Sequence, residues 1–234
     1  TFNFIFVDSK MRGMFSMLFG ASTLLVIQSA EAGGRSPLAV HYLRMLWLGV
    51  FGLAHFYFLW FGDILSLYAA CGLLLYFFRN ASIRALLLWA AGFLIVALLL
   101  IGSVWLSMAM LEGGQLTPDA AKGAQEQLAE FNAMMGPNSP AYVDEVRHYL
   151  GSYGTIIGER IGRDALEPLV QLMLFLWETM ALMLVGMALF KSRMLTGDWS
   201  APRYAKWAGL CFLLSVPPLA FLAWHTIDSG FDTV

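Results

Sequence analysis

Two ionisable residues interrupt one of the most apolar stretches of this chain. Between Leu46 and Phe78 nearly every side chain is apolar, apart from His55 and Asp63. A helix rises about 1.5 Å per residue, so His55 lies roughly 12 Å, a little over two turns, before Asp63 and shares a broad face with it. A neutral imidazole accepts a proton from an attacking hydroxyl or amine and later returns it. The spacing therefore predicts His55 as a general base and Asp63 as the carboxylate that orients it.

Both residues also have a structural interpretation, which the sequence leaves open. An acid directly before Ile64 favours the N-terminus of the next helix. A neutral histidine inside a helical bundle can donate one hydrogen bond in packing. Ionisable groups at such depth are costly and usually functional, which favours chemistry near this turn.

Three further charged residues are candidates for substrate binding. Glu178 follows Pro168 by ten residues, about 15 Å along a helix, a depth comparable to that of His55. A buried carboxylate is protonated or paired, so we expect Glu178 to pair with His55 or to line a watery cavity. Lys10 and Arg12 are expected at the same edge as Asp63, where they could hold a phosphate, a carboxylate or Asp63 itself. Snorkelling toward lipid headgroups is the more frequent alternative for such residues.

The composition indicates what must position these residues. Hydrophobic residues make up 59% of the chain and charged residues 13%, with a mean hydropathy of +0.68. Soluble domains carry about a quarter charged residues, so lipid is the expected solvent. Backbone amides in lipid are satisfied within helices, which predicts an all-α, polytopic transmembrane bundle. The predicted spans, about six, are residues 13–29, 45–61, 64–78, 85–111, 168–190 and 207–225.

The apolar stretch around His55 is too long for one crossing. A bilayer core takes roughly 20 apolar residues per helix, so residues 46–78 are expected to form two helices that meet at Gly62-Asp63. Trp47 and Trp60 bracket the first of these as interfacial anchors, and Gly49 and Gly52 are expected to serve packing.

The predicted organisation has three parts. Residues 1–111 form a four-span bundle, 112–167 an extracytoplasmic loop, and 168–234 the first two spans of a C-terminal domain. Within the loop, one helix is expected to start at 117–119 and end at 136–138. A second, amphipathic helix is expected from 139–140 through Ile157. Gly154, Gly158 and Gly162 would permit close helix contact, or leave that helix flexible. Pro217-Pro218 should kink the last helix.

Basic residues give the expected orientation. Eight of them share one side if six spans alternate: Arg35, Arg44, Arg79, Arg84, Lys191, Arg193, Arg203 and Lys206. The positive-inside rule assigns that side to the cytoplasm and the Asp63 side to the exterior. Thr1 then also lies outside, so a further span upstream is expected.

Other site classes are not expected. The 14 Lys and Arg residues are scattered, without the basic stripe of a nucleic-acid-binding protein. Cys71 and Cys211 lie in apolar runs and are expected to be buried thiols. No close cluster of histidine, cysteine and acids suits zinc, and no resident cofactor is expected. Membrane lipid is the expected partner, and the oligomeric state is open.

Four stretches, in order along nearly the whole chain, resemble the YeiB-like family of bacterial multi-spanning membrane proteins. The first is KMRGMFSMLFG at 10–20, similar to that family's K-x-x-x-x-F-S-x-L-F-G segment. The second runs from Arg44 to Gly49 and continues with His55, GDIL at 62–65, Tyr68-Ala69 and Gly72. The third is EVRHYLGSY at 145–153 followed by Arg160, and the fourth is MLVGMAL at 183–189.

The resemblance implies a bacterial inner-membrane protein with a C-terminal domain of unknown function. That family is distantly similar to transmembrane acyltransferases, including heparan-alpha-glucosaminide N-acetyltransferase, which pass an acyl group from a cytoplasmic donor to an acceptor across the membrane. It therefore implies transfer of an acyl or related group from an acyl thioester donor to an extracytoplasmic acceptor. The family's first helix and later C-terminal helices have no counterpart here. A proton-coupled transporter or lipid-handling permease using His55 and Glu178, and a partner subunit without chemistry, are the alternatives.

Overall fold

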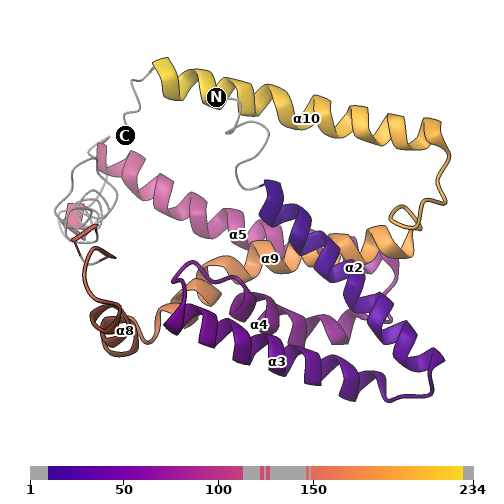
Figure 1. Cartoon of the computed structure of the whole chain (residues 1–234). Coiled ribbons are helices and arrows are strands. Elements are labelled where there is room, and N and C mark those ends of the chain that lie inside the picture. The colour runs from indigo at the N-terminus through magenta and orange to yellow at the C-terminus, as the bar shows by residue number, and fades with distance from the viewer. Residues whose placement is uncertain (1–9, 113–121, 124, 127–145, 148, 229–234) are drawn as a thin grey trace. The chain divides into compact units, whose positions relative to one another are not determined.

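The computed structural model describes residues 10–112, 122–123, 125–126, 146–147 and 149–228, and within these ranges the secondary structure is helical (Figure 1). The all-α class is therefore confirmed. The helices are α2 (Lys10–Ala32), α3 (Pro37–Phe58), α4 (Leu65–Leu75), the 3₁₀ turn η1 (Tyr76–Phe78), α5 (Ile83–Glu112), α8 (Tyr153–Gly162), α9 (Glu167–Lys191) and α10 (Ala201–Asp228).

Five of these helices are long and apolar enough to cross a membrane: α2, α3, α5, α9 and α10. The sixth apolar segment, Leu65–Phe78, is shorter, as the sequence predicts for the third span. Many large apolar side chains are exposed, Leu99 and Leu213 among them, and in water such a surface would drive aggregation. Lipid surroundings account for it, so the helices indicate a membrane protein.

The described residues divide into two compact units, each assembled from separate stretches of chain. The first unit takes the described residues up to Leu43, then Gly72–Ala90, then those from Thr179 onward. The second takes Arg44–Cys71 and the described residues between Ala91 and Glu178. Helices α3, α4, α5 and α9 have residues in both units. The three-part division along the chain stays a prediction.

In the first unit, α2 and the second half of α9 pack backbone against backbone. A Cβ placed on Gly20 would lie 2.7 Å from the carbonyl carbon of Met183 and would overlap its oxygen. A Cβ on Gly186 would meet the backbone of Met17 in the same way. Small residues at helix crossings let backbones approach closely in membranes. At Gly20 and Gly186 only glycine leaves enough room, because a Cβ would overlap the facing backbone. This contact involves two of the segments that carry the family resemblance.

Polar contacts at buried backbone groups also hold the first unit together. His41 is fully buried, and its Nε2 donates to the carbonyl oxygen of Gly72 at 2.8 Å while its ring stacks on Tyr76. Lys191 Nζ donates to the carbonyl oxygens of Arg79 and Ala81, both at 2.7 Å. These carbonyls follow η1, so the lysine at the end of α9 caps the turn between α4 and α5.

The structure corrects three expectations. The amphipathic helix predicted from 139–140 through Ile157 is interrupted, because Ser152 is extended (φ −76°, ψ 147°) and caps α8 by accepting from the Thr155 amide at 3.2 Å. A Cβ on Gly158 or Gly162 would meet no atom of the described residues within 4 Å, so these glycines mark no close helix contact in that part of the chain. Cys211 is exposed on α10, whereas Cys71 is buried.

Two other expectations concern the loop and the last helix. The predicted loop helix between 117–119 and 136–138 lies outside the described residues. Helix α10 continues through Pro217 and Pro218.

Candidate functional site

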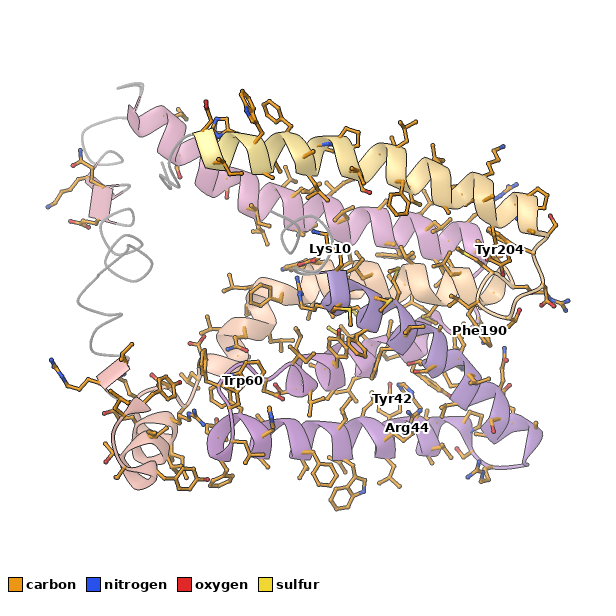
Figure 2. All side chains as sticks on the ribbon, turned by 45° about the horizontal axis from the view of Figure 1, so that its top comes forward. Lys10, Tyr42, Arg44, Trp60, Phe190 and Tyr204 are labelled. Atoms are coloured by element: carbon orange, nitrogen blue, oxygen red, sulfur yellow. The ribbon has the colours of Figure 1, made fainter. Side chains whose placement is uncertain are left out.

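The site lies in the second unit, at the turn that joins α3 to α4. Helix α3 ends where the carbonyl oxygen of His55 accepts from the amides of both Leu59 and Trp60, at 2.9 and 2.8 Å. Residues 59–64 then run without regular helix, which confirms that residues 46–78 form two helices. The indole of Trp60, labelled in Figure 2, covers Gly62, where a Cβ would lie 2.6 Å from the ring. A side chain at Gly62 would therefore displace the indole from this position.

His55 and Asp63 contact each other across this turn. Nδ1 of His55 donates to Oδ1 of Asp63 at 3.0 Å. The Asp63 side chain is fully buried, while that of His55 is 31% exposed. Because Nδ1 faces the carboxylate, the second ring nitrogen, Nε2, is the one left for chemistry. The structure therefore brings together the two residues predicted as base and orienting partner.

Ser66 fixes the other oxygen of the carboxylate. Its backbone amide and its hydroxyl both donate to Oδ2 of Asp63, at 2.9 and 2.8 Å. A side-chain oxygen that accepts an amide from the first turn of a helix is a helix cap. Asp63 thus performs both roles considered from the sequence, since one oxygen caps α4 and the other holds His55.

A close approach of α3 to α4 sets the spacing between these residues. A Cβ on Gly52 would overlap the Ser66 amide nitrogen and would lie 2.9 Å from the carbonyl carbon of Leu65. Gly49 is less constrained, with the Cβ of Ala69 at an ordinary contact distance of 3.5 Å. The predicted packing role is therefore strongest for Gly52, one turn before His55.

The segment around α8 holds the end of α3 from the other side. The hydroxyl of Tyr153 donates to the carbonyl oxygen of Phe58 at 2.6 Å, and Nη1 of Arg160 donates to that of Phe56 at 3.3 Å. In return, the hydroxyl of Tyr57 donates to the carbonyl oxygen of Ala165 at 2.7 Å. The last carbonyls of a helix have no partner inside it, so these donors anchor the turn of α3 that carries His55.

The other predicted site residues lie on α9 and α2. Glu178 is half-buried on α9 in the second unit, and the direct ion pair of His55 is with Asp63. A role for Glu178 beside His55 stays a prediction. Lys10 and Arg12 begin α2 in the first unit, and their expected position near Asp63 also stays a prediction.

The arrangement is that of a histidine held in one orientation for proton transfer. Donation from Nδ1 to a buried carboxylate selects the tautomer whose Nε2 accepts a proton, as in hydrolytic triads. Within the described residues no group of three or more histidine, cysteine or acidic side chains could hold a metal ion.

Sequence reasoning missed Ser66, Tyr153 and Arg160. An acid followed three residues later by a serine is a recognisable helix-start pattern, so Ser66 could have been found. Tyr153 and Arg160 belong to a stretch that carries the family resemblance, but nothing in it indicates their partners on α3, which lie 95 and 104 residues away in the sequence.

Comparisons with known proteins give short matches to bacterial relatives. The chain is 36% identical over 87 residues to "Uncharacterized protein YxaH" of Bacillus subtilis (strain 168), covering 37% of the chain and 22% of the relative. It is 38% identical over 74 residues to "Uncharacterized 39.9 kDa protein in amylase 3'region" of Bacillus acidopullulyticus, covering 32% and 21%. The chain thus spans about a fifth of the length of these curated relatives. No family model matches it, and no solved structure matches significantly.

Proposed function

We propose that this chain is part of a membrane enzyme that transfers an acyl or related group to a hydroxyl or amine acceptor, with His55 as general base. The observation that carries the proposal is the donation of His55 Nδ1 to a buried carboxylate that Ser66 also holds. A merely structural aspartate cap would need the contacts with Ser66 alone. The resemblance to the YeiB-like family, and its distant similarity to transmembrane acyltransferases, supports the same reaction class.

The proposed step conserves atoms and charge. The acceptor oxygen or nitrogen attacks the carbonyl carbon of an acyl thioester while Nε2 of His55 takes the acceptor proton. The carbon–sulfur bond then breaks, and the thiolate leaves with the proton returned from Nε2. Asp63 keeps the ring oriented and stabilises the transient imidazolium.

The proposed setting is the inner membrane of a bacterium. The basic residues that follow the first, third and fifth predicted spans support an exterior position for the Asp63 side, where the acceptor would bind. The proposed donor is an acyl thioester from the cytoplasm. The whole natural protein would provide the path between that donor and the acceptor.

A proton-coupled transporter is the second candidate. The helix is interrupted between α3 and α4 at a histidine and a carboxylate, and transporters place ion sites at such interruptions. In this case the His55–Asp63 pair would carry the proton, and no thioester would be consumed.

The decisive experiment uses the whole natural protein in liposomes. Radiolabelled acetyl coenzyme A is supplied as donor, with a panel of amino sugars, polyols and their phosphate esters as acceptors, and labelled product is measured. Asp63→Asn keeps the cap but places an amide N–H opposite Nδ1, which forces the ring proton onto Nε2. We expect His55→Gln and Asp63→Asn each to lower kcat by about 10²–10⁴-fold, the usual contribution of general acid–base catalysis.

His225→Gln is the matched control, because His225 is exposed on α10. It should leave the rate unchanged. Transfer that survives both site substitutions would reject the proposed base. Loss of an imposed pH gradient that requires His55, without consumption of donor, would favour the transporter.

A further inference from the structure

Arg160 is a buried cation beside the candidate site. It lies in the last turn of α8 and is 5% exposed. Its Nη1 donates to the carbonyl oxygen of Phe56, the residue that follows His55 in the chain. The guanidinium is therefore anchored at the main-chain carbonyl of the residue after the proposed base.

This guanidinium has more donors than partners. An arginine carries five N–H donors, and one of them is used on Phe56. The ring of Tyr149 lies 6.0 Å from the guanidinium carbon, at the outer limit of a cation–π contact. Among the described residues, no carboxylate forms an ion pair with Arg160. A buried, unpaired charge costs several kcal/mol, so a partner from outside the described chain is favoured.

The unused donors are not sealed inside the protein. No nitrogen of Arg160 is among the fully enclosed polar atoms without a hydrogen bond in the described residues. The nitrogens of Arg160 that do not bind Phe56 are therefore not completely enclosed by the described residues. Arg163, three residues later, differs in each respect, since its side chain is 79% exposed and its Nε donates to Asp164 at 3.3 Å.

We propose that Arg160 binds an oxyanion group, a phosphate or a carboxylate, of a molecule that approaches the His55–Asp63 pair. The planar fork of the guanidinium donates two parallel hydrogen bonds to such groups, and burial strengthens them. Combined with the proposed function, on which this step rests, the proposal means that the acceptor is an anionic molecule. Arg160 holds its oxyanion group while His55 takes the proton of its attacking hydroxyl or amine. Binding itself does not depend on transfer. The oxyanion has two sources, a soluble small molecule or the headgroup of an anionic phospholipid.

The test measures binding in the whole natural protein reconstituted in phosphatidylcholine nanodiscs. The midpoint of thermal unfolding is followed as inorganic phosphate or acetate is added. Because phosphate also stabilises proteins nonspecifically, each response is compared with that of Arg160→Gln and of the matched control Arg163→Gln. We expect Arg160→Gln to raise the phosphate or acetate concentration for a half-maximal shift by at least about tenfold, the loss of one charge-assisted bidentate contact. Arg163→Gln should match the wild type.

A second variant and a second membrane keep the result interpretable. Arg160→Lys keeps the charge and a donor for Phe56 but lacks the fork, so it should fold and bind severalfold more weakly even if Arg160→Gln does not fold. Phosphatidylglycerol nanodiscs without added anion test the lipid source. Stabilisation there that requires Arg160 assigns the site to a headgroup, whereas a response to added phosphate or acetate alone assigns it to a soluble ligand.

Two results would overturn the proposal. One is the absence of any Arg160-dependent shift with phosphate, acetate and phosphatidylglycerol, and the other is equal loss of binding in Arg160→Gln and Arg163→Gln. Failure of the proposed function is distinguishable. If no donor and acceptor react but Arg160-dependent binding persists, the transferase fails and the oxyanion site stands. If His55-dependent transfer proceeds with the same acceptor KM in Arg160→Gln, the oxyanion site fails alone.

Discussion

Replacing Gly52 with alanine should separate the two helices that hold the His55–Asp63 pair. The new Cβ would lie 2.9 Å from the carbonyl carbon of Leu65 and from Cα of Ser66. Carbon atoms prefer separations of about 3.5–4.0 Å, so the start of α4 must move away by roughly 0.6–1 Å. The contacts are with backbone, which cannot turn aside as a flexible side chain can.

The displacement is large compared with the tolerance of the hydrogen bond. Nδ1 of His55 and Oδ1 of Asp63 are 3.0 Å apart. Moving the carboxylate by about 1 Å would exceed the roughly 3.2 Å limit of an N–H···O hydrogen bond. Overpacking costs about 1–3 kcal/mol, and the better helix propensity of alanine offsets about 1 kcal/mol of that. We expect a net loss of up to about 2 kcal/mol of stability and, if the pair is catalytic, a loss of roughly 10²-fold in rate.

Two measurements check this prediction, with Gly92→Ala as control. Thermal unfolding in detergent reports stability, and the rate at which diethyl pyrocarbonate modifies His55, followed by mass spectrometry, reports loss of the Asp63 contact. Gly92 lies inside α5 in the same unit, and a Cβ there would meet no atom of the described part of the chain within 4 Å. The control should be neutral or slightly stabilised. If Gly52→Ala matches Gly92→Ala in both measurements, the close packing of α3 against α4 is not what sets the geometry of the pair.

Three further substitutions test contacts that lie within one or the other unit. Lys191→Met removes the charge-assisted bonds to the turn after η1 and should lower the free energy of unfolding by about 1–3 kcal/mol, whereas exposed Lys206→Met should not change it. Gly186→Ala places a Cβ in the backbone of α2 and should cost about 1–3 kcal/mol, while Gly209→Ala on α10 meets no atom and should not. Tyr57→Phe loses one hydrogen bond and should cost about 0.5–1.5 kcal/mol. Thermal unfolding of each variant in detergent supplies the values, and equal stability of a variant and its control, or of Tyr57→Phe and the wild type, would contradict the contact concerned.

The helical architecture could be predicted because lipid allows few alternatives. The apolar lengths alone predict the helices, and a run too long for one crossing predicts the break before Asp63. The pairing of His55 with Asp63 was also within reach, since both residues are local to one turn. The sequence predicts the ends of the helices less well than their number. The third predicted span, 64–78, is a helix only to Leu75 and continues as a 3₁₀ turn.

The long-range part of the site could not be predicted. Tyr153 lies in a segment interpreted as one amphipathic helix, whose interruption depends on a single serine cap at Ser152, and Arg160 follows that segment. Their acceptors are main-chain carbonyl oxygens, and every residue carries one, so no side-chain pattern identifies the partner. The close crossing of α2 and α9 was missed for a related reason, because a lone glycine in an apolar helix does not indicate what it faces.

The anchoring of α3 by residues far along the chain has a consequence for biosynthesis. Tyr57 and Ala165 are 108 residues apart. At a ribosomal rate of about 5–20 residues per second, His55 waits roughly 5–20 s after its own synthesis before that anchor exists. A nascent or prematurely terminated chain can therefore contain His55 and Asp63 but lack the hydrogen bond that anchors the end of α3. The histidine is held in its final position only late in translation.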